Sequence, residues 1–109
     1  MITIDIKRNN KNEIFSFSLN GHAGYDVNGK DIVCAAVSAV TNMVLIGLNE
    51  KLGIDLEFEK SDGGYLKVEL SEKTNSEEMK SAQVLLESMV TEFLDLESNF
   101  SKYILVKER

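Results

Sequence analysis

Residues 1–20, MITIDIKRNNKNEIFSFSLN, contain two short stretches in which apolar and polar side chains alternate. Isoleucine occupies every second position from 2 to 6, and residues 14–19 alternate in the same way. A period of two is typical of strands that bury one face. The polar segment 8–12, RNNKN, has the composition of a turn. The sequence therefore predicts a β-hairpin in this first part of the chain.

Beyond this hairpin, two segments have the residue pattern of helices. Residues Ile32 to Leu48 are apolar nearly all round, which predicts a helix buried in the protein, and Asp31 is placed to be its N-cap. From Met79 to Leu96, apolar residues recur every three or four positions, which predicts an amphipathic helix. Residues 74–77, TNSE, offer this second helix a capping box.

Three further strands complete the expected layout. Residues 52–60 and 66–70 alternate, and the SDGG sequence at 61–64 between them predicts a hairpin turn. Tyr103 to Val106 predicts a short last strand. The order ββαββαβ indicates an α+β fold, a two-layer sandwich in which two helices pack on a mostly antiparallel sheet. We expect a single domain over residues 1–109, because the length suits one domain and no linker divides it.

The composition limits the classes of function. The formal net charge of −6 repels phosphate backbones, so we expect no nucleic-acid partner. The single cysteine excludes an intrachain disulfide. The first residues lack the pattern of a signal peptide, and the uncharged run 32–49 is at the short limit for a bilayer span. We therefore expect a cytoplasmic protein with no membrane partner.

The loop between the first hairpin and the first helix region holds the only histidine and the only cysteine, His22 and Cys34. Residues 24–30 match the start of a P-loop, G-x-x-x-x-G-K, but Asp31 follows where that motif has Ser or Thr, and the match is interpreted as chance. His22, Cys34, Asp26 and Asp31 lack the paired spacing of structural zinc sites. We expect no metal and no other cofactor.

A cysteine nucleophile with a histidine base is the third interpretation of this loop. Cys34 falls in the first turn of the predicted helix, where the helix dipole favours a thiolate. His22 follows the second strand, so the sheet could hold it while the loop folds back toward Cys34. Backbone N–H groups around Cys34 would then point toward an oxyanion. The residues alone leave open the alternative of a buried structural thiol and an unrelated surface histidine.

The segments GHA at 21–23 and GKDIVCAAVS at 29–38 resemble the ribosomal-processing cysteine protease family, Prp. The N-terminal hairpin, the DGG turn at 62–64 and the last strand agree with that family in layout. The resemblance implies a bacterial, homodimeric thiol protease. Such an enzyme removes an N-terminal extension from a large-subunit ribosomal protein precursor, which makes it a hydrolase of ribosome biogenesis.

The resemblance also implies roles for individual residues. Cys34 matches the nucleophile of the family and His22 its general base. Asp31 could orient His22 or act only as a helix cap, and Ser38 could bond the thiol, a loop carbonyl or its own helix. Three loop glycines could be hinges of a lid or simple turn residues: Gly21, Gly24 and Gly29. We expect the loop to be open or disordered without substrate.

The sequence thus favours a cysteine endopeptidase that acts by thiolate attack and hydrolysis of an acyl-enzyme. The acidic surface suits a basic ribosomal substrate. The alternative is a non-catalytic ribosome-assembly or partner-binding protein, in which Cys34 is structural and the loop only binds a partner.

Overall fold

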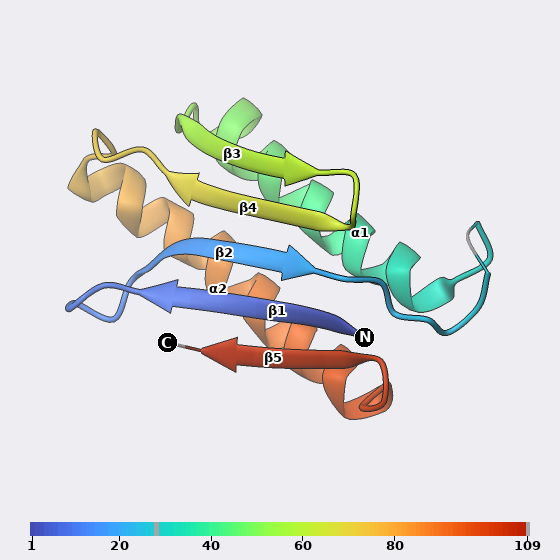
Figure 1. Cartoon of the computed structure of the whole chain (residues 1–109). Coiled ribbons are helices and arrows are strands. Elements are labelled where there is room, and N and C mark those ends of the chain that lie inside the picture. Colours follow the sequence, from blue (N-terminus) through green and yellow to red (C-terminus); the bar gives the residue numbers. More distant parts are fainter. Residues whose placement is uncertain (28, 109) are drawn as a thin grey trace.

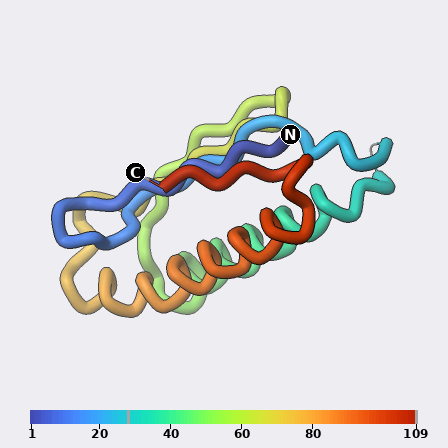
Figure 2. Tube along the Cα trace, turned by 90° about the horizontal axis from the view of Figure 1, so that it is seen from below, coloured from blue at the N-terminus to red at the C-terminus, as the bar shows by residue number. Residues whose placement is uncertain are grey.

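The computed structural model describes residues 1–27 and 29–108, in which a five-stranded sheet carries two α-helices on one face (Figures 1 and 2). The elements follow in the order β1 (Ile2–Arg8), β2 (Ile14–Asn20), α1 (Ile32–Ile46), a π-helical turn (Gly47–Lys51), β3 (Leu56–Ser61), β4 (Tyr65–Leu70), α2 (Ser76–Asn99) and β5 (Ile104–Glu108). The predicted α+β sandwich and its ββαββαβ order are confirmed.

The strands lie in the order β3-β4-β2-β1-β5. β1 pairs antiparallel with β2, β2 with β4, and β4 with β3, whereas β5 pairs parallel with β1. The sheet is therefore mostly antiparallel, as predicted. β2 is the central strand and is hydrogen-bonded on both sides, to β4 and to β1. The chain that continues beyond β2 therefore starts from the middle of the sheet.

The hydrophobic core fills the space between the sheet and the helices. Every second side chain of a strand faces the helices, which explains the alternation in the sequence. From the sheet the core takes Ile4, Ile6, Phe17 and Val68 among others. The apolar stripe of α2 contributes its buried residues from the other layer: Ala82, Leu86, Met89, Val90 and Phe93.

The prediction that the first helix is buried all round is wrong. Ile32, Met43 and Ile46 expose 55%, 65% and 47% of their surface. The outer side of α1 has no third layer to cover it, because both helices lie on the same face of one sheet (Figure 2). By length and composition alone, residues Ile32–Lys51 are long and apolar enough to cross a membrane.

Several element boundaries differ from the sequence-based expectation, the last strand among them, which spans Ile104–Glu108. The third strand begins at Leu56 and not at residue 52, because the chain remains helical through Lys51 and then turns at Gly53, which has a φ of 68°. The capping box of α2 consists of Asn75 and Glu78, one residue later than predicted. Each side chain of this pair accepts a hydrogen bond from the other's backbone N–H, at 2.8 and 3.0 Å.

An ion-pair cluster joins β1, α2 and β5. Arg8 binds both carboxylate oxygens of Glu87 at 2.7 and 2.9 Å and one oxygen of Glu108 at 2.9 Å. The bond to Arg8 lowers the pKa of Glu87. Because these charges are partly exposed, we expect the cluster to fix the register of the three elements more than it stabilises the fold.

The contrast between the two sides of α2 gives a test of the layer arrangement. We expect Leu86→Ala to lower the free energy of unfolding by about 2–5 kcal/mol, because it opens a cavity in the core. Val84→Ala, on the exposed side of the same helix, is expected to stay within about 0.5 kcal/mol of wild type. Urea unfolding measures both variants, and equal losses would contradict the assigned faces.

Candidate active site

His22 lies directly after β2, and two backbone contacts fix that part of the chain. The N–H of Gly21 donates to the carbonyl oxygen of Gly64 at 3.0 Å, which extends the β2–β4 ladder past Asn20. The Met1 amino group donates to the carbonyl oxygen of His22 at 2.6 Å. The sheet therefore holds the backbone of His22 while its side chain remains exposed.

Cys34 lies in the first turn of α1, and its side chain is partly exposed. The N–H of Ala23 donates to Cys34 Sγ at 3.4 Å. The sulfur therefore lies beside a backbone donor and at the N-terminal end of the helix. The thiol is therefore accessible and lies beside groups that suit a nucleophilic sulfur.

The carboxylate of Asp31 accepts four backbone hydrogen bonds. Oδ1 accepts from Val33 and Cys34 at 3.0 and 2.9 Å, and Oδ2 accepts from Tyr25 and Asp26 at 3.0 and 3.4 Å. The Cys34 N–H makes the largest contribution to lowering the pKa of Asp31, against the opposing effect of partial desolvation. The predicted helix cap is confirmed. The same carboxylate also holds the loop onto the helix.

An aromatic contact holds the loop on its other side. The ring of Tyr25 packs edge-on against Phe100, with centroids 6.0 Å apart, and against Tyr103, with centroids 5.2 Å apart. Both partners lie in the connection between α2 and β5. Asn28, inside the loop, lies outside the described residues. The expectation of an open or disordered loop without substrate stays a prediction.

One cavity brings the predicted site residues together. His22, Cys34, Asp31 and Ser38 line a cavity of about 480 Å³, together with Gly24, Asp26, Gly29 and Ala35. The described residues include no hydrogen bond from the imidazole of His22 to the thiol or to Asp31. Roles for Asp31 in orienting His22, and for Ser38 beside the thiol, remain predictions.

Three first-turn N–H groups of α1 are engaged inside the protein, which differs from the expectation that such groups face an oxyanion. Those of Val33 and Cys34 donate to the Asp31 side chain. That of Ala35 donates to the Asp31 carbonyl oxygen at 3.1 Å. The cap that starts the helix therefore occupies the donors that the sequence pattern assigned to catalysis.

Comparison with known proteins decides the family. The family model described as cysteine protease Prp matches residues 1–105. The chain is 34% identical over 106 residues to the ribosomal processing cysteine protease Prp of Bacillus subtilis, covering 92% of this chain and 90% of that protein. It is 32% identical over 107 residues to Prp of Staphylococcus aureus, covering 95% of each. The chain belongs to the cysteine protease Prp family.

The fold of a solved member agrees with this assignment. The crystal structure of the essential ribosomal processing protease Prp from S. aureus, in complex with a covalently linked product peptide, superimposes with a TM-score of 0.89. It is 25% identical, and the alignment covers 100% of both chains. Membership of the Prp family confirms the expectation of a cysteine peptidase.

The glycines of the loop between β2 and α1 differ in their surroundings. Gly21, with a φ of 96°, is packed so closely that a side chain there would collide with the carbonyl oxygen of Met1. Gly24 and Gly29 also have positive φ but lie in open space. Close approach to Met1 therefore explains why position 21 is glycine, while a hinge role for Gly21, Gly24 and Gly29 stays a prediction.

Three parts of the site escaped the sequence analysis: the Ala23 N–H, the ring of Tyr25, and Gly64. Of these three, only Tyr25 could have been identified from the sequence, because a large aromatic residue is unusual in so polar a loop. A backbone donor leaves no trace in the residue type. Gly64 was interpreted only as part of a turn.

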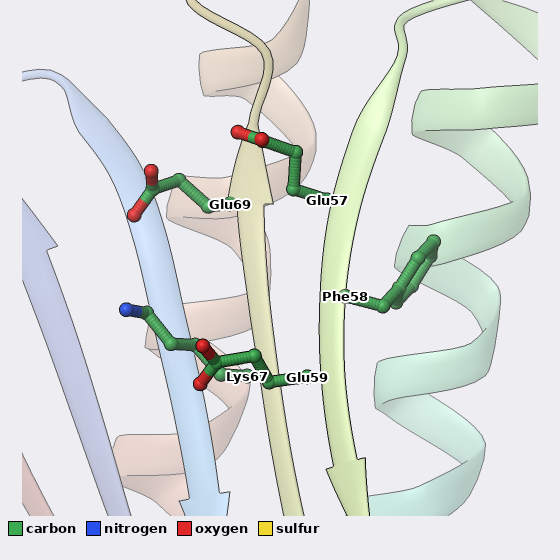
Figure 3. A pocket seen from close by; sticks show the side chains of 5 residues that line it. All are labelled: Glu57, Phe58, Glu59, Lys67 and Glu69. Atoms are coloured by element: carbon green, nitrogen blue, oxygen red, sulfur yellow. The ribbon is translucent and has the colours of Figure 1, made fainter.

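A second hollow lies over β3 and β4 (Figure 3). Its lining consists of Glu57, Phe58, Glu59, Lys67 and Glu69, of which the Phe58 ring points toward α1. Three carboxylates line this hollow, and none of its lining residues is a cysteine or serine that could act as a nucleophile. Among the described residues, no group of three or more His, Cys, Asp or Glu side chains is arranged to hold a metal ion. The cavity beside Cys34 remains the candidate active site.

The bonds of Asp31 predict how stability depends on pH. Its pKa in the folded state is below the ordinary value of 3.8, so its contribution is complete above that pH and is lost as the pH falls through the folded-state pKa. We expect wild type to be more stable than Asp31→Asn at pH 7. This difference should shrink below pH 3.8, where the unfolded chain takes up the proton first.

Urea unfolding between pH 2 and pH 7 measures this difference. Asp95→Asn, an exposed position on α2, controls for the loss of one surface carboxylate. A constant gap between wild type and Asp31→Asn across the whole range would contradict the assignment.

Proposed function

We propose that Cys34 is the nucleophile and His22 the general base of a cysteine endopeptidase. The observation that carries this proposal is that a helix start and a strand end bring these two side chains to one cavity. Family membership supports it, because the family is named for a cysteine protease. Cys34 and His22 are also the only cysteine and the only histidine in the chain.

The proposed reaction is acyl transfer. His22 accepts the thiol proton while Cys34 Sγ attacks the carbonyl carbon of the scissile peptide bond. The tetrahedral intermediate collapses as the C–N bond breaks, and the imidazolium gives its proton to the leaving amine. A water molecule then attacks the thioester, which releases the carboxylic acid and restores the thiol. The Ala23 N–H lies beside the sulfur from which this attack starts.

The proposed substrate is a large-subunit ribosomal protein precursor with an N-terminal extension. The names of the B. subtilis and S. aureus relatives, both ribosomal processing proteases, support this class. Charge supports it as well, because the chain has a net charge of −6 and ribosomal proteins are basic. Asp26 and Asp31 place carboxylates in the lining of the cavity, where they would face a basic peptide. The setting that we propose is the bacterial cytoplasm.

We also propose that the protein is a homodimer. The exposed apolar side chains of α1 support this, because Met43 and Ile46 would otherwise face water on a helix that is apolar all round. Phe58 is exposed as well, at the edge of the sheet beside α1 (Figure 3). A second copy would cover this part of the surface.

Cleavage of a precursor tests the peptidase. We expect mass spectrometry to detect one new N-terminus after incubation with wild type. Cys34→Ala should give none, because the nucleophile is gone, and His22→Ala should lose at least about a hundredfold in rate. Ser88→Ala, a small exposed residue on α2, is the control for handling.

Alkylation of the single thiol separates the peptidase from the binding-protein alternative. A catalytic Cys34 should react with iodoacetamide at mildly acidic pH, and His22→Ala should weaken that reaction. A thiol that stays inert until the protein unfolds, together with intact precursor, would favour the non-catalytic protein.

The dimer has its own test. We expect wild type to sediment as a dimer and Met43→Lys to shift toward monomer, since a charge would enter the apolar contact. Leu105→Lys changes an exposed apolar residue on the sheet and serves as the control. Loss of the dimer in the control alone would place the contact on the sheet, and a monomeric wild type would contradict the proposal.

A further inference from the structure

Gly64 ends the turn between β3 and β4 and lies against the imidazole ring of His22. It has a φ of 80°. A Cβ at this position would lie 2.8 Å from Nε2 and 2.9 Å from Cε1 of His22, and 3.0 Å from the carbonyl oxygen of Gly21. Real Cβ atoms essentially never come within 3.0 Å of another heavy atom in this way. The ring therefore occupies space that any side chain at position 64 would take.

The turn itself explains only part of this glycine. Residues 62–64 connect Ser61 to its partner Tyr65, and a hairpin loop of this length commonly needs a left-handed residue at its end. Asparagine adopts that conformation with less strain than most other residues that carry a Cβ. The turn thus accounts for a positive φ at position 64, whereas the contacts with the His22 ring and with the Gly21 carbonyl oxygen leave little room for a Cβ.

The same residue is tied to the backbone that carries the histidine. Gly64 accepts the hydrogen bond from Gly21 N–H at 3.0 Å, one step beyond the last β2–β4 pair of Asn20 and Tyr65. The ladder therefore fixes the position of Gly64 relative to the backbone just before His22. Because Gly64 cannot move away from that backbone, it limits where the His22 ring can lie.

We infer that Gly64 is a positioning residue for the peptidase reaction, whose bare α-carbon lets the His22 imidazole lie where it serves Cys34. This inference rests on the proposed function. A general base must be within hydrogen-bond reach of the proton that it takes, and small displacements reduce the rate strongly. Because the His22 side chain is exposed, a Cβ at position 64 would displace the ring without breaking the core.

The variant that separates the turn from the contact is Gly64→Asn. Asparagine suits the left-handed turn and still places a Cβ against the ring. Gly53→Asn is the matched control, because Gly53 has a φ of 68° and a Cβ there would meet no atom within 4 Å. We expect both variants to fold, with a larger loss of unfolding free energy in Gly64→Asn, whose Cβ also meets the carbonyl oxygen of Gly21.

The readout is the rate of iodoacetamide alkylation of Cys34 against pH, together with kcat and KM for precursor cleavage. We expect Gly64→Asn to lower alkylation at mildly acidic pH and kcat by about tenfold or more, with little change in KM. Gly53→Asn should match wild type in all three. A Gly64→Asn protein with wild-type alkylation and kcat would overturn the inference.

A double-mutant cycle shows whether the effect passes through His22. If it does, Gly64→Asn should add nothing to the loss already caused by His22→Ala. An equal further loss in that background would mean that Gly64 acts on the fold, which also overturns the inference. Gly64→Ala, with the same Cβ, repeats the cycle if the asparagine variant fails to fold.

The cycle also separates this inference from the proposed function. An unchanged alkylation profile and cleavage rate in His22→Ala would overturn the peptidase mechanism and, with it, the role of Gly64. A strong effect of His22→Ala with none for Gly64→Asn would overturn the role of Gly64 alone.

Discussion

The Asp31 carboxylate accepts backbone hydrogen bonds from two directions, and the geometry of the site depends on this. One oxygen starts α1 and so sets where Cys34 lies, while the other holds the N–H groups of Tyr25 and Asp26. The helix start and the loop are thus fixed to each other through a single side chain. These hydrogen bonds lower the pKa of Asp31, so its side chain is a carboxylate at neutral pH. The connection between the loop and the helix therefore depends on this negative charge.

The two proposed reacting groups come from different layers of the fold. His22 extends from the central strand of the sheet, and Cys34 from the first turn of a helix packed on that sheet. Their separation is therefore set by packing between the layers, together with the loop contacts of Ala23 with Cys34 and of Tyr25 and Asp26 with Asp31. Gly64 adds a third support, from a hairpin that neither residue belongs to.

The sequence predicted what depends on local periodicity. Alternation and helical spacing were enough for the order of elements, and the cap at Asp31 follows from its residue type. The exposed side of α1 was missed, because burial depends on how many layers the fold has. At the site, residue identity pointed to His22 and Cys34, whereas the donor at Ala23 and the contact of Gly64 arise between segments distant in sequence.

The parallel pair of β1 and β5 has a consequence for how this protein forms during synthesis. Ile2 pairs with Ile104, and its N–H bonds the carbonyl oxygen of Tyr103 at 2.8 Å. Contacts this distant in sequence require closure of a very long loop and are expected late in folding. On a ribosome, β1 must wait for almost all of the described chain to emerge before its second neighbour arrives. A nascent chain would therefore remain without its finished sheet until β5 has emerged from the ribosome.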